Sequence, residues 1–251
     1  MSDPVIDILM YHSISDGGGA TSIAPSVFAD QMQAIADAAV PVITLDDLLA
    51  AHAGTKELPP QSVVLTFDDA LQDFADTAFP VLEGHGFPAL VYVPTDHVGE
   101  TENWDRSGGR KRPIMTWDTM RDLAGQGVGF GSHSVTHSDL TMLSAETLDV
   151  ELSVSKAEIE DRLGQKVLHF APPYGFSNAQ VAAHAGRFYK TAAGTRLDRA
   201  TLSNDLMDLP RIEMFYFIAP DRWRAHLDGS GASYLAQRRF LRGVKQMLPG
   251  L

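Results

Sequence analysis

The sequence has 251 residues, of which 44% are apolar and 21% are charged, and its formal net charge is −12. This balance is typical of a folded globular protein, and an acidic chain without a basic stripe argues against DNA, RNA and anionic membrane surfaces as partners. The chain has no cysteine, which excludes disulfides, zinc–thiolate sites and cysteine nucleophiles.

Short apolar runs alternate with longer amphipathic segments, which predicts alternating strands and helices. In chain order the pattern predicts a strand at Val5–Met10, a helix at Val27–Ala39, a strand at Val42–Thr44, a helix at Asp46–Ala53, a strand at Ser62–Phe67, a helix at Ala70–Gly84, a strand at Ala89–Val93, a helix at Thr116–Ala124, a strand at Val128–Ser132, a helix at Ser144–Leu163, a strand at Val167–Phe170, a helix at Asn178–Gly186, a strand at Thr191–Ala193 and a final helix at Asp221–Met247. Ser144 is the expected N-cap of the helix at Ser144–Leu163 and Gly164 its expected end.

Such alternation predicts an α/β fold with parallel strands covered by helices. We expect an irregular (β/α) barrel of about seven parallel strands, forming a single domain over residues 1–251, with a doubly wound open sheet as the alternative. The polar stretch Glu100–Arg112 follows a strand and is expected to be a loop on the active face.

The sequence shows neither the pattern of a secretory signal nor that of a transmembrane segment. Residues 1–4 have no basic region followed by an apolar run, so we expect no secretory signal and a cytoplasmic protein, unless a leader has been removed. No apolar stretch reaches 18 residues, so no transmembrane segment is expected.

The candidate catalytic and metal-binding residues lie just after the predicted strands, where a parallel barrel places its active site. Asp68 and Asp69 follow the third predicted strand, and two adjacent carboxylates repel unless a cation or proton compensates them. The alternative is that they cap the helix that follows.

His133 and His137 follow the fifth predicted strand, four residues apart, in a segment whose Gly131 and β-branched residues favour a turn. Two imidazoles and one carboxylate form a common open ligand set for a divalent metal, although an isolated histidine pair is often only structural. His12 follows the first strand and is either a structural histidine or a proton donor across the site from Asp68.

The sequence lacks a Gly-x-Ser-x-Gly elbow, a Gly-x-Gly-x-x-Gly turn after the first strand and a Walker loop, which argues against a serine hydrolase and nucleotide-cofactor enzymes. The segment Pro172–Gly175 after the sixth strand is either a plain turn or part of the site.

Three segments, in this order, resemble the first three motifs of the polysaccharide deacetylases, also called the NodB-homology or family 4 carbohydrate esterases: Thr66-Phe67-Asp68-Asp69, His133-Ser134-Val135-Thr136-His137 and Phe170-Ala171-Pro172-Pro173-Tyr174-Gly175. The opening Ile8–Ile14 is similar to the subgroup of poly-N-acetylglucosamine deacetylases. The resemblance implies a deformed (β/α) barrel and covers about residues 5–215.

By position, the resemblance implies that Asp68 is the general base and His12 the catalytic acid, and that the backbone N–H of Tyr174 supports the oxyanion. It implies a divalent metal on Asp69, His133 and His137, with zinc expected first and cobalt, nickel or manganese as alternatives. We also expect the substrate to be contacted by Trp104, Pro173 and Arg211.

The sequence departs from the family pattern at two positions. Ala70 stands where the family usually has Gly, and Ala171 stands where many members have an Arg that orients the base. A late Leu-x-His motif is also absent, and Arg211 in that region is a candidate to replace the missing guanidinium.

The function expected from the resemblance is metal-dependent hydrolysis of an N-acetyl amide on an amino-sugar polysaccharide or oligosaccharide. Two alternatives remain: an amidase or deformylase acting on a lipid-linked sugar or cyclic amide, and an inactive carbohydrate-binding homologue. The oligomeric state is not predicted.

Overall fold

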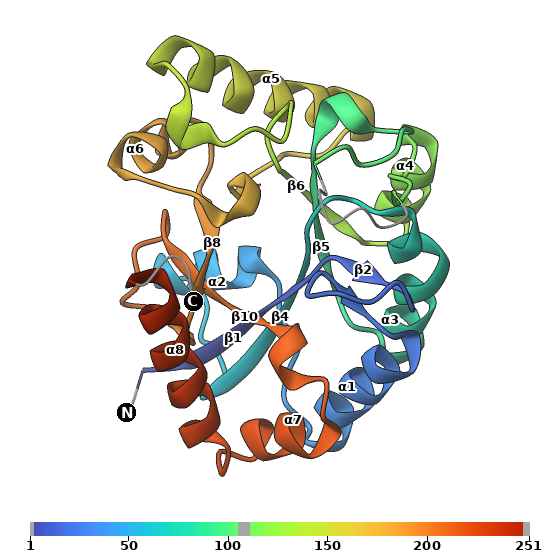
Figure 1. Ribbon diagram of the computed structural model, residues 1–251, viewed down its shortest axis with the longest axis vertical. Helices are drawn as coiled ribbons and strands as arrows, with labels where there is room; N and C mark the ends of the chain where they lie inside the picture. The colour runs from blue at the N-terminus through green and yellow to red at the C-terminus, as the bar shows by residue number, and fades with distance from the viewer. Residues whose placement is uncertain (1–2, 105–110, 248–251) are drawn as a thin grey trace.

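In the computed structural model, which describes residues 3–104 and 111–247, a closed barrel of parallel strands is covered by helices (Figure 1). The strands of the barrel, in chain order, are β1 (Val5–Tyr11), β4 (Gln61–Phe67), β5 (Leu90–Val93), β6 (Gly129–Ser132), β7 (His169–Phe170), β8 (Thr191–Leu197) and β10 (Leu209–Glu213). Each pairs in parallel with its neighbours, and β10 returns to pair with β1, with Leu9 opposite Ile212. The predicted seven-stranded barrel is therefore confirmed for the described residues, and the open sheet is wrong.

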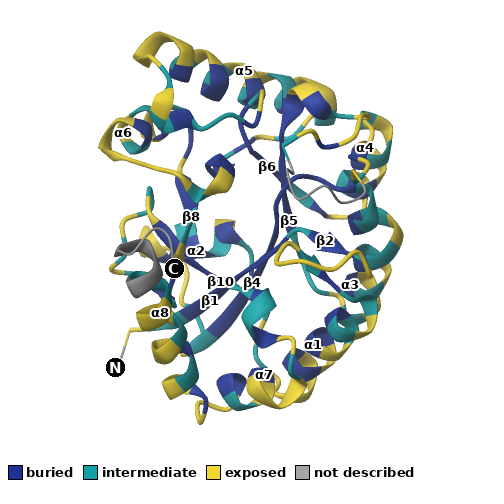
Figure 2. Cartoon of the chain, viewed as in Figure 1, coloured by how far each residue is buried: buried dark blue, intermediate teal, exposed yellow. Residues whose placement is uncertain are grey.

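Helices cover the outside of this barrel, with exposed residues on their outer faces (Figure 2). They are α1 (Pro25–Asp37), α2 (Leu45–His52), α3 (Phe79–His85), α4 (Trp117–Gly125), α5 (Ala145–Leu163), α6 (Ala179–Phe188), α7 (Pro220–Leu227) and α8 (Ala232–Met247). Ser144 caps α5 by accepting a hydrogen bond from the Thr147 N–H, and Gly164 ends it in the left-handed conformation. Both predicted helix signals are thus confirmed.

The strands are apolar on both faces because the barrel has two apolar layers. Ile8 and Val64 belong to a cluster in the barrel interior, whereas Leu9 and Leu65 belong to the larger cluster beneath the helices. Alternate residues of a strand point to opposite faces, so burial on both sides requires the continuous apolar runs seen in the sequence.

The final helix predicted at Asp221–Met247 is two helices, α7 and α8. The chain turns between them at Gly229, whose φ is 82°, and at Gly231, where an added Cβ would lie 2.8 Å from the His226 nitrogen. Glycine is required at both points, since a side chain would be strained or would clash. The helical pattern on either side had concealed this break.

The helix predicted at Ala70–Gly84 starts later than expected. Ala70 has a φ of 50°, and the chain enters a π-helical turn at Phe74–Ala78 before α3 begins. Pro80 lies at the start of α3 and has no N–H to donate, so the hydrogen-bond ladder is interrupted here.

The remaining differences concern short or polar strands. The predicted strand at Val42–Thr44 is reduced to one bridge between Val42 and Val63. Strand β10 was not expected because Pro210 and Arg211 interrupt its apolar pattern, and β8 extends beyond Ala193 to Leu197. The short strands β2 (Ser13–Ile14), β3 (Ser22–Ile23) and β9 (Ala200–Thr201) were also missed.

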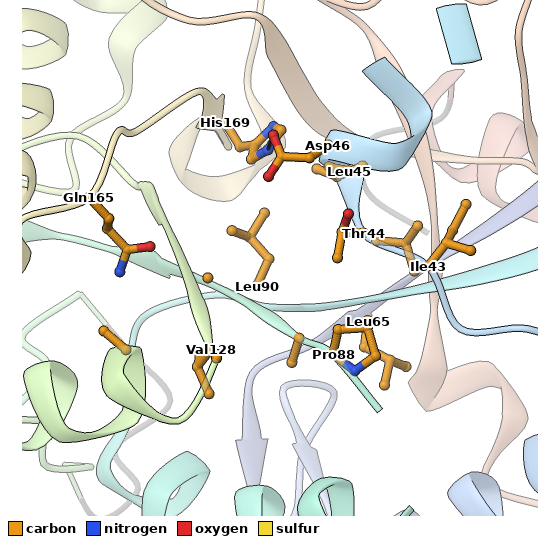
Figure 3. A pocket seen from close by; sticks show the side chains of 15 residues that line it. Ile43, Thr44, Leu45, Asp46, Leu65, Pro88, Leu90, Val128, Gln165 and His169 are labelled. Atoms are coloured by element: carbon orange, nitrogen blue, oxygen red, sulfur yellow. Dashed lines mark ion pairs between the residues drawn. The ribbon is translucent and has the colours of Figure 1, made fainter. Parts of the chain in front are cut away.

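A cavity of about 250 Å³ opens at the amino ends of the strands, away from the predicted site (Figure 3). Its walls are largely aliphatic, and His169 lies at its edge with Nε2 3.3 Å from an Asp46 carboxylate oxygen. His169 also has Nδ1 2.9 Å from the Thr191 hydroxyl. This histidine therefore has a structural environment.

Among the helices of residues 3–104 and 111–247, none has the length and apolarity needed to cross a lipid bilayer.

Gly131 offers a test of the packing inside the barrel. A Cβ at this position would lie 2.7 Å from the Tyr92 ring and 2.9 Å from the His169 carbonyl oxygen. We expect Gly131→Ala to lower the free energy of unfolding by about 1–3 kcal/mol, since backbone and ring must both shift. Gly125→Ala, where nothing lies within 4 Å, should leave stability unchanged or raise it. Urea unfolding of both variants measures this, and equal stabilities would contradict the prediction.

Candidate active site

The residues singled out in the sequence converge at the carboxyl ends of the barrel strands. His12 follows β1, Asp68 and Asp69 follow β4, and His133 and His137 follow β6. Both carboxylates and the latter two imidazoles are at least nine-tenths buried. Neither carboxylate caps a helix in the described part of the chain, so the capping alternative is wrong.

Asp69, His133 and His137 form a compact group of three ligand-type side chains. The Asp69 Oδ1 lies 3.5 Å from His133 Nε2 and 3.2 Å from His137 Nε2, and the three ligand atoms all lie within 4.8 Å of one another. The two rings come from a turn, as the sequence favoured. This is a carboxylate and two imidazoles facing one point, with a side left open for other ligands.

The hydrogen bond of the His133 ring fits a divalent cation at that point. The His133 Nδ1 donates to the Ala171 carbonyl oxygen at 2.7 Å, so its Nε2 turns a lone pair toward Asp69. Burial lowers the pKa of His133 to about 4, which keeps this ring neutral near neutral pH. A lone pair and a carboxylate oxygen repel unless a cation or proton lies between them, so this group can hold a metal ion.

Burial alone would raise the pKa of Asp69, but the hydrogen bond with His137 and the nearby imidazoles hold it well below its usual range. Asp69 is therefore ionised at neutral pH, which is the form that binds a cation.

The backbone around this group is locally strained. Asp69, Ala70, Ser134, His137 and Tyr174 all have positive φ, between 50° and 72°. Such conformations cost about 1–3 kcal/mol each and persist only where the surroundings fix them. Ala70 adopts the left-handed conformation that a Gly would adopt easily, so its replacement of the usual Gly leaves the turn in place.

Glu151, which the sequence analysis missed, holds the turn that carries both histidines. One carboxylate oxygen accepts hydrogen bonds from the Val135 and Thr136 N–H groups at 2.8 and 3.0 Å, and the other accepts from the Thr136 hydroxyl at 2.7 Å. A signal was present, since Glu151 lies among the buried residues Leu148 and Leu152 on the inner face of α5. A carboxylate on an apolar face implies a buried partner.

Asp68 is paired with Arg211 from β10. The guanidinium donates to both carboxylate oxygens at 2.6 and 2.8 Å, and it also bonds the Thr66 hydroxyl at 3.2 Å and the Gly194 carbonyl at 2.8 Å. Burial raises the pKa of Asp68, but the charge and hydrogen bonds of Arg211, together with the nearby His133 and His12, lower it by more, so that the pKa lies below its usual value. The His12 Nε2 lies 3.9 Å from Asp68, so base and candidate acid are close neighbours.

The expectation that Arg211 contacts the substrate is wrong. Its side chain is fully buried, and four of its five N–H groups bond the groups just described. The geometry is instead that of a guanidinium that orients Asp68, in the place left by Ala171.

Aromatic rings form the rim of the site. Trp104 stacks on His137 with ring centroids 3.9 Å apart, and the Tyr174 ring meets the same imidazole edge-on at 4.8 Å. Tyr174 is 45% exposed, whereas Pro173 is buried beneath it. Of the loop predicted at Glu100–Arg112, residues 105–110 lie outside the described residues.

Comparison with known families gives one match that spans residues 55–192, just over half of the chain, to a family model described as polysaccharide deacetylase. This segment contains Asp68, Asp69, His133, His137 and Tyr174.

The individual relatives have low sequence identity to this chain, and the share of the chain that they match varies. The chain is 23% identical over 210 residues to YxkH of Bacillus subtilis (strain 168), covering 83% of this chain and 71% of that protein. It is 27% identical over 124 residues to the poly-beta-1,6-N-acetyl-D-glucosamine N-deacetylase of Escherichia coli (strain K12), covering 46% of this chain but only 18% of that protein. Among solved structures, the Streptococcus pyogenes deacetylase PplD superposes with a TM-score of 0.74 at 27% identity, covering 84% of this chain and 92% of that one.

The ligand group makes a direct prediction about metal content. We expect the protein to bind one equivalent of zinc, and Asp69→Asn or His133→Ala to lose it, because two ligands do not hold the ion against dilution. Asp46→Asn, which alters an aspartate beside a histidine at the opposite end of the barrel, should keep the metal. Elemental analysis of the purified proteins measures this, and full metal content in both site variants would refute the ligand assignment.

Glu151 should affect metal affinity without touching the metal. We expect Glu151→Ala to weaken zinc binding about 10–100-fold, as loss of supporting hydrogen bonds around ligands does. Glu158→Ala, on the same helix and paired with Arg162 at 3.9 Å, should bind zinc normally. Competition with a chelator reports both affinities, and equal values would exclude the supporting role.

Proposed function

Because the chain belongs to the polysaccharide deacetylase family, we propose that it hydrolyses the N-acetyl amide of an amino-sugar unit in a saccharide chain. The observation that carries this proposal is the pairing of two buried sites at one strand end. Asp69 faces two imidazoles, and the adjacent Asp68 faces a guanidinium and His12. The Asp69 group suits a cation, and the Asp68 group suits a general base and a general acid.

The proposed cofactor is a divalent cation held by Asp69, His133 and His137, with zinc first because its usual ligands are imidazoles and carboxylates. When bound, such an ion polarises an acyl oxygen and acidifies water. Cobalt, nickel and manganese suit the same ligand types.

Asp68 is placed to take the proton of the attacking water. Its lowered pKa means that it is ionised at neutral pH and ready to accept a proton. Arg211 fixes the plane of this carboxylate through two hydrogen bonds, which directs a lone pair toward the site and limits rotation.

His12 is the proposed acid, because it lies at the same strand end and 3.9 Å from Asp68. It would give a proton to the nitrogen as the C–N bond breaks, releasing acetate and a free amine. The Tyr174 N–H is the proposed donor to the developing oxyanion, since this residue is held next to His137 in a left-handed turn. Trp104, already stacked on His137, is the proposed flat surface for a sugar ring.

The proposed substrate class is a saccharide chain that contains N-acetylglucosamine units. The support is the sequence similarity to poly-beta-1,6-N-acetyl-D-glucosamine N-deacetylases and the Tyr11-His12 motif after β1. The structural relative PplD is described in complex with acetate, which is the acid released in the proposed reaction.

Acetate release from short N-acetylglucosamine oligomers tests the function. We expect zinc-dependent release of acetate and an equal amount of amine. Formate release from a formylated analogue, without acetate release, would favour the deformylase alternative. Stoichiometric metal with no hydrolysis of any acylated sugar would favour the inactive homologue.

Asp68→Asn tests the assigned base. We expect the variant to keep its metal but to lose about 10²-fold or more in kcat, since an amide cannot take the water proton. Asp122→Asn, an exposed position on α4, serves as the control and should leave kcat unchanged. A wild-type kcat in Asp68→Asn would remove Asp68 from the mechanism.

A further inference from the structure

A cleft of about 460 Å³ opens beside the Pro172–Gly175 turn, two of whose residues line it. Its walls are Pro172 and Gly175, residues of β8, and the second half of α8. Gly175 approaches so closely that an added Cβ would overlap Thr195 of β8. The volume falls within the ~300–1,000 Å³ that is usual for small-molecule sites.

The cleft is positive, although the protein as a whole is strongly negative. Three arginines line it, Arg196, Arg239 and Arg242, together with two carboxylates, Asp198 and Asp208. The lining residues therefore carry 3 − 2 = +1, in a chain whose formal charge is −12. A local positive charge against such a background selects for an anionic ligand.

The guanidinium donors of these arginines are only partly used. Arg196 donates through Nε and one terminal nitrogen to Asp208, and Arg239 donates through one nitrogen to Asp198 at 2.6 Å. Both pairs are largely exposed, so each is weakly held and can share a further ligand.

Arg242 makes no hydrogen bond or ion pair with any residue of the described chain. Arg242 does act on Glu213 through its charge. Burial raises the pKa of Glu213, and the charges of His12, Arg211 and Arg242 offset part of that rise. Glu213 and Arg242 form no ion pair within 4 Å, so the guanidinium is available to a ligand.

We propose that this cleft binds a carboxylate-bearing sugar unit next to the N-acetylated unit being hydrolysed. This inference rests on the proposed function, because it assigns the neighbouring unit of the same substrate. A carboxylate carries one negative charge, which matches the single excess charge of the lining, whereas a phosphate monoester carries about −1.5 to −2. Arginine also binds a carboxylate through two parallel hydrogen bonds.

The position of the cleft fits a neighbouring sugar rather than a separate site. Tyr174 lies directly before Gly175 in the chain, and its ring is 4.8 Å from the His137 ring. A saccharide that crosses this exposed tyrosine therefore passes from the ligand group into the arginine cleft.

Two tetrasaccharides that differ only in charge test the proposal. The first alternates N-acetylglucosamine and glucuronate, and the second is the same molecule after reduction of each carboxylate to a primary alcohol. Calorimetric titration of the zinc-loaded protein should show about tenfold tighter binding of the first, and this preference should shrink in 0.5 M salt. The ratio of kcat/KM for acetate release should follow the same order.

Arg242→Gln should remove most of this preference without weakening binding of the reduced tetrasaccharide. The matched control is Arg238→Gln on the same helix, because Arg238 loses the same charge but packs on Tyr216 and Tyr234 instead of the cleft. Circular dichroism checks that both variants are folded.

The outcomes separate this inference from the proposed function. A charge preference that Arg242→Gln abolishes supports the cleft even if no acetate is released, in which case the proposed function fails alone. Equal binding of both tetrasaccharides by the wild type, or an undiminished preference in Arg242→Gln, overturns the cleft assignment even if acetate is released from neutral oligomers.

Discussion

Two neighbouring carboxylates, Asp68 and Asp69, are buried at the end of one strand, and much of the surrounding structure compensates their charge. Removing an ionised carboxylate from water costs several kcal/mol unless a partner offsets it. Asp68 follows the strand directly and reaches Arg211, whereas Asp69, whose backbone is left-handed, reaches the two histidines. The two carboxylates therefore have different partners. Asp68, the proposed base, pairs with the fixed guanidinium of Arg211, whereas Asp69 is placed to bind an exchangeable metal ion.

This arrangement requires several residues with a strained, left-handed backbone. Hydrogen bonds from elements distant in the sequence hold these residues in place. Glu151 of α5 bonds the two residues that lie between the left-handed Ser134 and His137, and the Ala70 carbonyl accepts a hydrogen bond from the Met115 N–H. These contacts fix the conformation from outside the site, so the ligand side chains do not have to order themselves when an ion binds.

The fold and half of the site could be predicted because they depend on local patterns. Apolar runs located most strands of the barrel, and the residues after them located Asp68, Asp69 and the histidines. Arg211 was singled out but given the wrong contact, because only the closed barrel shows that β10 lies within reach of Asp68. Glu151 and the break at Gly229 were missed, since a helical pattern does not reveal which polar residue turns inward or where a helix restarts.

The segment that matches the family model supplies the ligands and the base, yet both partners of the base come from outside it. His12 follows β1 and Arg211 belongs to β10, on either side of residues 55–192. These are the two strands whose pairing closes the barrel, with Leu9 opposite Ile212. Closure of the barrel therefore also completes the environment of the base, because Asp68 meets the Arg211 charge only when β10 pairs with β1. A chain that formed only the central strands would bury Asp68 without a partner, and burial would then raise its pKa and favour the neutral acid.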